Sequence, residues 1–417
     1  MEQMSPRRGT ARLAGPADQH SVRNHNLALV LQHVAATTES SRARLAADTG
    51  LNKTTVSSLV TELLERRLLT EGGVRRSGEV GRPAVTVQLD GDVYVAIGME
   101  INVDSMAFSV VDLRSRVRDE GWVVFDNRTR SAEEALEALA ELVSTAVRRV
   151  AVEGLVPVGA SIGLPGLVDA KRRSMLIAPN LGWHDVPVSD ILRELLPDGL
   201  DVTVDNEANL AALAERWHGA GRELTDFIHI SGEVGVGAGV IINGTLHRGA
   251  VGFGGELGHM TLEPDGPACA CGGRGCVETY IGLEPTLRLA GFDVTEAMGA
   301  DDDAPAAADR LAEAARAGDE QVLTALTSVG AMLGTAMSSA VNLLSPQGIV
   351  LGGYFTALHE WLEPAIAEQL HARVLAERQQ PTQILPSRLQ REATARGAAE
   401  QVLREVLANP TRVPPTG

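Results

Sequence analysis

The strongest constraint on this sequence is a short loop that holds all three of its cysteines. Cys269, Cys271 and Cys276 fall within eight residues of one another, ten positions after His259. Tetrahedral zinc sites are commonly built from three thiolates and one imidazole, and the glycines between the second and third cysteines let the backbone fold around an ion. Four protein ligands leave no position for a reactive water, so we expect one structural Zn²⁺ per chain. The alternative is three ordinary buried cysteines beside a core histidine.

Two carboxylates, Glu256 and Glu278, bracket this loop and could hold several hydroxyl groups. The run Gly-Glu-x-Gly-His-Met-Thr from residue 255, followed by Cys-x-Cys-Gly-x-x-Gly-Cys-x-Glu, resembles the signature of the ROK family (repressors, uncharacterised reading frames and sugar kinases). The resemblance extends from about Tyr94 to Leu407. It implies that His259 and the cysteines hold zinc, and that both glutamates and the same histidine contact a sugar.

The resemblance implies further sugar-binding positions in the segments before the loop. Together with the loop residues, the expected sugar-binding set is Asn180, Asn206, Glu207, Glu256, His259 and Glu278. Charged and amide groups suit a polyol, because each hydroxyl needs a partner in fixed geometry.

Composition and charge narrow the compartment and the partners. No apolar run approaches the roughly 20 residues that cross a bilayer, and the first 20 residues lack the apolar core of a secretory signal. Free thiols in a metal-site pattern fit a reducing compartment. We therefore expect a cytoplasmic protein with no membrane partner.

The charge is distributed unevenly along the chain. Residues 1–90 carry 12 Lys and Arg against 9 Asp and Glu, whereas the remainder carries 25 against 45. The net charge of −17 is thus the sum of +3 and −20. Such an asymmetry hints at a separate nucleic-acid-binding module near the N-terminus.

Apolar spacing predicts three short helices after a disordered segment, residues 1–20. The first has one apolar face, made of Leu27, Val30, Leu31 and Val34. The second covers residues 41–48 and ends at Thr49-Gly50, and Asn52 caps a third that runs to about Arg67. Three helices with a glycine turn before the third match helix-turn-helix geometry, in which the last helix enters the major groove.

The third helix carries the side chains expected to contact DNA. They lie opposite its apolar stripe or near its start: Lys53, Thr54, Thr55, Ser57, Ser58 and Thr61. The alternative is a three-helix bundle whose polar face meets water.

A basic, glycine-bearing segment follows and weighs against that alternative. It contains Arg75, Arg76 and Gly81-Arg82-Pro83, and it precedes an alternating strand at residues 84–89. This reads as the wing of a winged helix that places an arginine in a minor groove. Residues 21–90 also resemble the N-terminal domain of ROK repressors, which ROK kinases lack.

Strands alternate with helices after residue 91, which indicates an α/β domain. Strands are expected at 94–101, 106–112, 122–125 and 156–162, and a capping box of Ser131 and Glu134 begins a long helix over 131–150. The resemblance implies the two-lobed actin-like ATPase fold of the ROK/hexokinase type, preceded by an all-α winged helix-turn-helix domain. This sugar-binding domain would span 91–408, with lobe I at 92–205 plus 390–408 and lobe II at 206–389. Residues 409–417 are expected to form a disordered tail.

The positions that would bind ATP in a ROK kinase depart from the family pattern. Glu100-Ile101-Asn102-Val103-Asp104 stands in place of Asp-x-Gly-Gly-Thr, and Glu233-Val234-Gly235 in place of Gly-Thr-Gly. Gly352-Gly353 survives, but a glycine pair after a strand is a weak signal. Lost glycines and added carboxylates disfavour a triphosphate.

The residue at the catalytic position also differs. Asn206-Glu207-Ala208-Asn209 replaces Asn-Asp-Ala-Asn, and the extra methylene of Glu207 displaces the carboxylate enough to cost roughly a hundredfold in rate. We read Glu207 as a sugar-hydroxyl acceptor, with a helix-capping role as the alternative, and we expect no enzymatic activity.

These features predict a sugar-responsive transcriptional regulator, most simply a repressor of carbohydrate uptake or catabolism genes. It would bind double-stranded operator DNA as a homodimer or homotetramer and take a sugar or sugar derivative as effector. One alternative is an ATP-dependent, glucokinase-like sugar kinase with an appended DNA-binding domain. Another is a regulator controlled by a partner protein.

Overall fold

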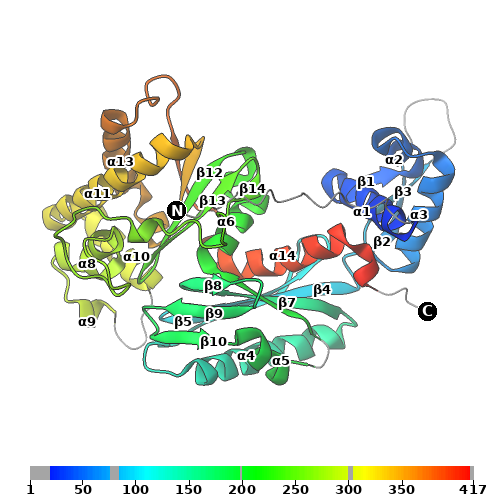
Figure 1. The fold of residues 1–417 in the computed structure, drawn as a ribbon, viewed down its shortest axis with the longest axis horizontal. Helices are drawn as coiled ribbons and strands as arrows, with labels where there is room; N and C mark the ends of the chain where they lie inside the picture. The colour runs from blue at the N-terminus through cyan, green and yellow to red at the C-terminus, as the bar shows by residue number, and fades with distance from the viewer. Residues whose placement is uncertain (1–18, 76–83, 198–199, 299–303, 414–417) are drawn as a thin grey trace, which may run out of the picture. The chain divides into compact units, whose positions relative to one another are not determined.

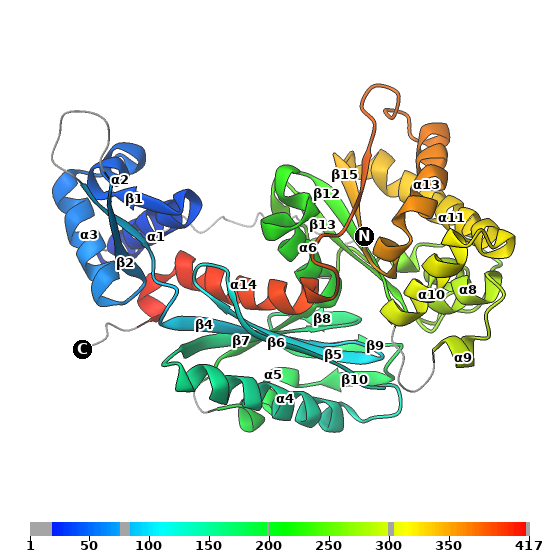
Figure 2. The same ribbon diagram turned by 180° about the vertical axis from the view of Figure 1, so that it is seen from behind.

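The computed structural model describes residues 19–75, 84–197, 200–298 and 304–413 (Figures 1 and 2). The chain divides into two compact units, Met1–Asp90 with Arg404–Gly417 (the N-terminal unit) and Gly91–Leu403 (the main unit). The expected boundary near residue 90 coincides with this division. Residues 404–408, at the end of the final α-helix, belong to the N-terminal unit, whereas the sequence-based prediction placed them in lobe I.

The N-terminal unit contains three helices and a small sheet. The helices are α1 (Gln19–Thr37), α2 (Arg42–Thr49) and α3 (Lys53–Glu65). Strands β1 (Glu39–Ser41), β2 (Leu69–Arg75) and β3 (Ala84–Leu89) form a three-stranded sheet in the order β1-β3-β2. The unit is therefore a winged helix-turn-helix domain, as expected, and its three helices are accompanied by a small sheet that includes the strand predicted at 84–89.

Local sequence signals set the boundaries of α2 and α3. Gly50 follows α2 in the left-handed conformation, with φ of 71°, which a glycine adopts at no steric cost. Asn52 caps α3 by accepting a hydrogen bond from the Thr55 amide at 2.8 Å. Both features agree with the sequence prediction, because caps depend on residues only a few positions apart.

The C-terminal segment is ordered against this unit as far as Val413. Pro410–Arg412 form a 3-10 turn, η4. Asn24 of α1 donates to the Asn409 side chain at 2.9 Å, and Arg66 donates to the Val413 carbonyl at 2.5 Å. The expectation of a disordered tail is thus wrong for residues 409–413, because the sequence gives no sign that this proline-rich segment has binding partners far back in the chain. Residues 414–417 lie outside the described ranges.

The main unit has two lobes, each built on a five-stranded sheet with its own hydrophobic core. The first sheet has the order β11-β7-β4-β5-β6. Its strands are β4 (Tyr94–Ile101), β5 (Ser105–Asp112), β6 (Val117–Val124), β7 (Val156–Leu164) and β11 (Val202–Asn206). Helices α4 (Ala132–Val152) and α5 (Val188–Leu195) cover one face, and the first part of α14 (Ala393–Ala408) covers the other (Figures 1 and 2).

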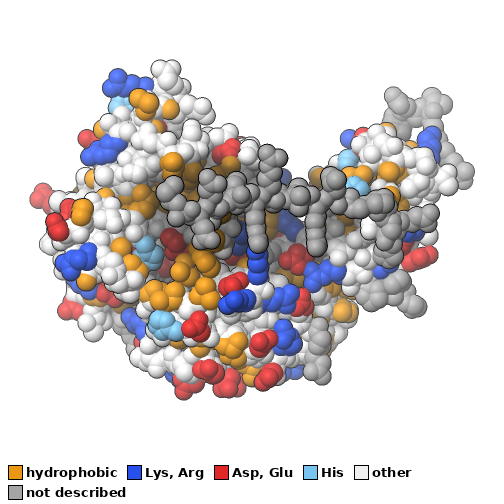
Figure 3. All heavy atoms as spheres, viewed as in Figure 1, with side chains coloured by type: hydrophobic (Ala, Val, Ile, Leu, Met, Phe, Trp, Pro, Cys, Tyr) orange, Lys and Arg blue, Asp and Glu red, His pale blue; other side chains and the backbone are white. Residues whose placement is uncertain are grey.

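Two local features shape this lobe. The capping box of Ser131 and Glu134 begins α4, as the sequence predicts. Gly98 of β4 has no side chain, and a Cβ there would collide with the backbone of Ala395 in α14, so the glycine allows helix and sheet to approach closely. On the face drawn in Figure 3, acidic side chains gather along the edge near α4 and α5.

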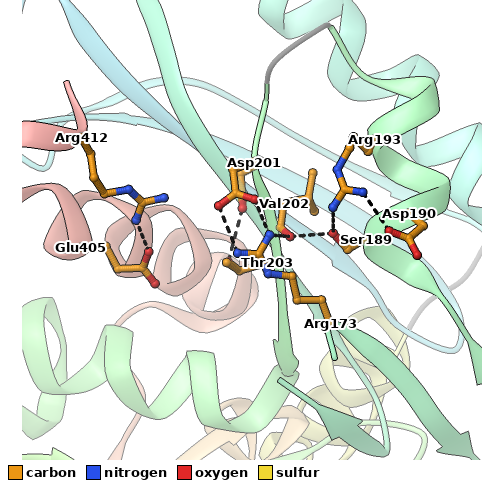
Figure 4. A network of polar contacts seen from close by, with 10 residues as sticks. Arg173, Ser189, Asp190, Arg193, Asp201, Val202, Thr203, Glu405 and Arg412 are labelled. Atoms are coloured by element: carbon orange, nitrogen blue, oxygen red, sulfur yellow. Dashed lines mark hydrogen bonds and ion pairs between the residues drawn. The ribbon is translucent and has the colours of Figure 1, made fainter. Parts of the chain in front are cut away.

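A small antiparallel sheet is attached to the first lobe. It consists of β8 (Leu167–Asp169), β9 (Ser174–Ala178) and β10 (Trp183–Val186). Arg173 in the β8–β9 turn forms an ion pair with Asp201 and donates to the Val202 carbonyl at 3.2 Å, and Ser189 of α5 donates to the same carbonyl at 2.9 Å (Figure 4). These contacts hold the small sheet and α5 at the start of β11, whose other end carries site residues.

The second lobe is built on a sheet of order β14-β13-β12-β15-β16. Its strands are β12 (Phe227–Gly232), β13 (Val236–Ile242), β14 (Thr245–Leu246), β15 (Gly348–Gly353) and β16 (Gln383–Pro386). Its longer helices are α6 (Glu207–His218), α8 (Leu283–Leu289), α10 (Ala304–Arg316), α11 (Glu320–Leu344) and α13 (His359–Arg373). Short turns of helix lie at α7 (Glu278–Ile281), α9 (Val294–Ala297), α12 (Tyr354–Ala357), η1 (Ala220–Glu223), η2 (Leu257–His259) and η3 (Gln390–Glu392).

Helix α11 is apolar over much of its length. By length and composition it is the one helix in the described ranges that could cross a membrane, although a buried core helix has the same properties. Most of its apolar side chains belong to the core of the second lobe, whereas Leu343 near its end is exposed. Gly330 and Gly334 lie against the backbone of Leu362 and Ile366 in α13, so a partner helix covers α11 closely. The packing is that of a core helix.

Candidate functional site

The carboxyl ends of the parallel strands form one edge of the first sheet. Glu100 pairs with Gly163 and Asn206 with Leu164, so β4, β7 and β11 end at the same level. The segments that follow these strands supply Asn102, Gly166 and Glu207 to a single cleft. Ligands bind at this edge of open α/β sheets, because loops that are distant in sequence meet there.

Asn206 and Glu207 sit where β11 turns into α6. Asn206 caps the helix by accepting from the Asn209 amide at 3.1 Å, and it donates to the Gly166 carbonyl at 3.1 Å and to Glu207 Oε2 at 2.7 Å. Asn206 therefore caps the helix. The alternative role predicted for Glu207, that of the helix cap, is not the one it has. Burial raises the pKa of Glu207 well above its ordinary value, with the nearby Glu256 and Glu100 adding to the effect.

The second lobe faces this edge with the cysteine loop and the start of β13. Glu256, His259 and Glu278 line the same cleft as Asn180, Asn206 and Glu207, so the six residues of the expected sugar-binding set come together. Glu278 accepts from the Val236 amide at 3.0 Å, which fixes its carboxylate at the start of β13. A Cβ at Gly235 would lie 2.5 Å from Glu278 Oε2 and 2.9 Å from Asn180 Nδ2, so only glycine leaves room for both side chains.

His259, Cys269, Cys271 and Cys276 form one cluster, with their ligand atoms all within 4.8 Å of one another. The Sγ atoms of Cys271 and Cys276 are 3.7 Å apart, and Cys269 Sγ is 3.7 Å from His259 Nδ1. Zinc–sulfur bonds of about 2.3 Å in a tetrahedron separate two thiolates by about 3.8 Å. The donor set and its spacing therefore fit a metal ion, and the reading as ordinary buried cysteines does not explain the convergence.

The backbone of the cysteine loop is shaped for this cluster. Gly275 has φ of 64°, and a Cβ there would collide with the Glu263 carbonyl. The Cys269 amide donates to the Gly273 carbonyl and the Gly272 amide donates to the Cys269 carbonyl, both at 3.0 Å. The loop therefore holds the thiols in place through its own turns.

His259 belongs both to the cysteine cluster and to the lining of the cleft. Its Nδ1 faces the thiol of Cys269, while the residue also lines the cleft. One nitrogen can thus ligate a metal while Nε2 is left for a ligand, which explains how a single histidine can serve both purposes.

An ion pair that the sequence does not predict lies beside the cleft. Arg248, in the loop after β14, pairs with both carboxylate oxygens of Asp205, at 2.7 Å for Nη1 and Oδ1. Asp205 is 3% exposed and raises the pKa of Arg248. The pair links the end of β11 in the first lobe to the second lobe, and 43 residues separate the partners in sequence, so no local pattern could reveal it.

The two segments expected to stand in place of phosphate loops both carry side chains at the cleft. Val103 is 2% exposed, and Asn102 Oδ1 accepts from the Val103 amide at 2.7 Å. Glu233 occupies the turn between β12 and β13, where its amide donates to the Gly235 carbonyl at 2.8 Å. Burial, with Asp104 and Glu100 nearby, raises the pKa of Glu233 well above its ordinary value.

In the N-terminal unit, α3 presents a polar face. Lys53, Thr54, Ser57, Ser58 and Thr61 are exposed, and Thr55 is half-buried. Val56, Leu59, Val60 and Leu63 are buried on the opposite side. Arg75 ends β2, whereas Arg76 and Arg82 lie outside the described residues.

Comparison with known proteins agrees with this architecture. The ROK family matches residues 96–405, so the chain belongs to the ROK family. It is 31% identical to the xylose repressor of Bacillus spizizenii over 395 residues, which cover 94% of this chain and 98% of that protein. With its winged helix, the chain stands in the transcriptional-regulator branch of the family.

Two solved structures show the same fold. A ROK family transcriptional regulator, a homologue of the Escherichia coli MLC protein, superposes with a TM-score of 0.77 at 23% identity, covering 94% of this chain and 99% of its own. A ROK family glucokinase from Streptomyces griseus, in complex with glucose and AMPPNP, gives a TM-score of 0.63 at 29% identity, covering 74% of this chain and 98% of its own. The main unit is thus shared with kinases as well as with regulators.

Proposed function

We propose that this chain is a sugar-responsive repressor of carbohydrate uptake or catabolism genes, acting in the cytoplasm. The single observation that carries the proposal is the cleft of the main unit, where six polar side chains converge next to the cluster of His259 and three cysteines, in a chain that also has a winged helix. The likeness to a xylose repressor supports a sugar as effector and double-stranded operator DNA as the target.

The sugar would be held by the six polar residues that line the cleft: Asn180, Asn206, Glu207, Glu256, His259 and Glu278. Desolvation raises the pKa of Glu207 and of Glu256. A protonated carboxyl group both donates and accepts hydrogen bonds and an ionised one accepts them, so either form suits hydroxyl groups. The metal ion is Zn²⁺ in this proposal, because three thiolates and one imidazole are its usual structural ligands. It would fix the loop that presents His259 and Glu278.

The kinase alternative rests on the likeness to the glucokinase structure. Against it, Glu207 replaces the aspartate of the family pattern, and its extra methylene displaces the carboxylate from the position of a general base. Asn102, Val103 and Glu233 also stand where ATP phosphates would approach backbone amides. We therefore propose a domain that binds sugar and transfers no phosphoryl group.

Regulation would follow from lobe closure in a homodimer or homotetramer. Half-sites on one face of DNA lie about 34–36 Å apart, so a modest change in the separation of two winged helices weakens binding. The sugar would favour one setting of the hinge between the lobes.

A thermal-shift panel of sugars, with and without ATP and Mg²⁺, tests the proposal. One sugar at about 100 times its Kd should add about 2.7 kcal/mol to the stability of the protein. ATP should produce no shift, and no ADP should form. Stabilisation by ATP with sugar-dependent ADP release would establish the kinase instead, and a panel without any response would remove the sugar effector.

Lys53 would contact a DNA phosphate from the start of α3, together with Thr54, Thr55, Ser57, Ser58, Thr61 and the wing residues Arg75, Arg76 and Arg82. Lys53→Ala should weaken binding to an operator selected from random DNA by about tenfold. It should also reduce the salt slope by about one, with little change in sequence preference. Titrations at several salt concentrations measure both quantities.

Lys171 provides a matched control, because it is exposed in the main unit and is the only other lysine of the chain. Lys171→Ala should leave operator affinity and salt slope unchanged. Equal effects of the two substitutions would show that α3 does not face the DNA.

A further inference from the structure

A second cavity of about 290 Å³ lies beside the sugar cleft in the main unit. It shares Asn102, Ser231 and Glu233 with the cleft and extends to Gly352-Gly353 at the end of β15. None of the six residues proposed to hold the sugar lines it. The proposed function therefore leaves this cavity unused.

Two carboxyl groups define the chemistry of its wall. Glu100 ends β4 and interacts with the hydroxyl of Thr394, and Glu233 lies 3.4 Å from the Ser231 hydroxyl. Within the described ranges, no ion pair joins either carboxyl group to a basic side chain. Burying a carboxylate without a cationic partner costs free energy, so this wall disfavours an anion and favours a cation.

His229 of β12 supplies an independent sign of a ligand. Its side chain is 1% exposed and lines the cavity, yet neither ring nitrogen has a hydrogen-bond partner in the protein. Burial lowers the pKa of His229 to about 4, so the ring is neutral and offers an acceptor nitrogen. A buried polar group without a partner costs about 1–3 kcal/mol, which a ligand with a hydrogen-bond donor would recover.

Two arginines also line the cavity, and each guanidinium group contacts an aromatic ring. The Arg391 guanidinium lies 4.8 Å from the ring centre of Trp122, and the Arg316 guanidinium lies 5.7 Å from that of Trp361. Both arginines are exposed. The cavity thus combines two half-buried carboxyl groups and a buried histidine with two exposed arginines that already contact aromatic rings.

We propose that this cavity binds a small organic amine, whose ammonium group faces Glu100, Glu233 and the neutral ring of His229. The cavity is lined by Glu100, Asn102 and Glu233, which lie in the two segments that the sequence comparison aligns with kinase phosphate loops. It adjoins the sugar cleft, contains none of the six side chains proposed to hold the sugar, and does not depend on which sugar binds there.

Calorimetric titration of the full-length protein with a matched pair of probes tests this proposal. 1,4-Diaminobutane should bind saturably, whereas 1,4-butanediol, of similar size but uncharged, should bind at least about tenfold more weakly. 4-Aminobutyrate, added as a third probe, should fall between them, since it keeps one ammonium group and adds an anion. Equal binding of diamine and diol, no binding of the diamine at tens of millimolar, or displacement of the diamine by AMPPNP would overturn the proposal.

Glu100→Gln provides the matching variant, because Glu100 lines this cavity and not the sugar cleft. Diamine affinity should fall at least about tenfold, since the charge is lost while the shape is kept. The control is Glu137→Gln on the exposed face of α4, which should bind the diamine as the wild type does. Circular dichroism of both variants confirms that they fold, and undiminished affinity in folded Glu100→Gln would exclude the site.

The pH dependence gives a second readout. Burial raises the pKa of Glu100 to about 7; the hydrogen bond with Thr394 lowers this pKa and the charge of Asp104 raises it. Burial also raises the pKa of Glu233, and the charges of Asp104, Glu100 and Glu207 raise it further. Because more Glu100 is ionised at pH 8 than at pH 6 and an alkylamine stays protonated throughout, diamine affinity should increase several-fold over this range. An affinity that falls as the pH rises would contradict the assignment.

Discussion

Replacing Cys276 with serine should abolish metal binding and sugar binding together. Cys276 is 3% exposed, and its Sγ lies 3.7 Å from that of Cys271. Structural zinc contributes about 10–16 kcal/mol of apparent binding free energy in small zinc-dependent domains, so a missing ligand releases the loop. Glu278 lies two residues beyond Cys276 and would lose its position beside Val236. We expect zinc content to fall from one ion per chain to near zero and sugar affinity to fall about a hundredfold or more.

Metal analysis of the purified variant and calorimetric sugar titration measure these effects. The chain has no cysteine outside the cluster, so the control uses histidine: His259→Gln should behave like Cys276→Ser, whereas His184→Gln, at an exposed position in β10, should change nothing. Operator binding should persist in all three variants. Sugar affinity that survives loss of the metal would show that the loop keeps its shape by its own turns.

Local signals account for much of what the sequence predicted. Strand 84–89 agrees with β3, strand 94–101 agrees with β4, and Asn52 and the Ser131 capping box begin their helices as expected. Each depends on residues within a few positions of one another. Strand β6 was predicted at 122–125 but extends over Val117–Val124. Its first half carries charged residues, which an edge strand tolerates but which conceal the strand pattern in the sequence.

Contacts between distant segments account for what the sequence missed. The small sheet of β8, β9 and β10 has short strands in which apolar and polar residues do not clearly alternate. The ion pair between Arg173 and Asp201 helps to fix its position. The order of Asn409 to Val413 depends on Asn24 and Arg66, more than 340 residues earlier. Pairing at this distance leaves no periodicity in either segment.

The site divides in the same way. The cysteine loop is a compact motif, so its four ligand residues could be chosen from spacing alone. The convergence of Asn180 and Glu278 around Gly235, and the amine cavity with its buried His229, depend on how strands from different lobes pack. The family pattern predicted the sugar-binding set, but it could not indicate which side chains would be engaged with each other, as Asn206 is with Gly166 and Glu207.

Arg248→Met should destabilise the main unit by about 3 kcal/mol. Removing one partner of a buried ion pair leaves the other charge without compensation, at a cost of about 3–5 kcal/mol. Asp205 is 3% exposed, but a third of the Arg248 side chain is exposed, so we expect the lower end of this range. Because the pair joins the strand end that precedes Asn206 to the second lobe, sugar affinity should fall as well. Chemical denaturation and sugar titration measure the two effects.

Two further variants separate the buried charge from the loss of packing. Arg288→Met breaks an exposed ion pair with Glu284 within α8 and should cost no more than about 0.5 kcal/mol. The double variant Asp205→Asn/Arg248→Met should regain part of the lost stability, because the uncompensated carboxylate is gone. If the double variant is less stable than Arg248→Met alone, the arginine acts through its packing and not through its charge. The connection between the lobes would then be steric rather than electrostatic.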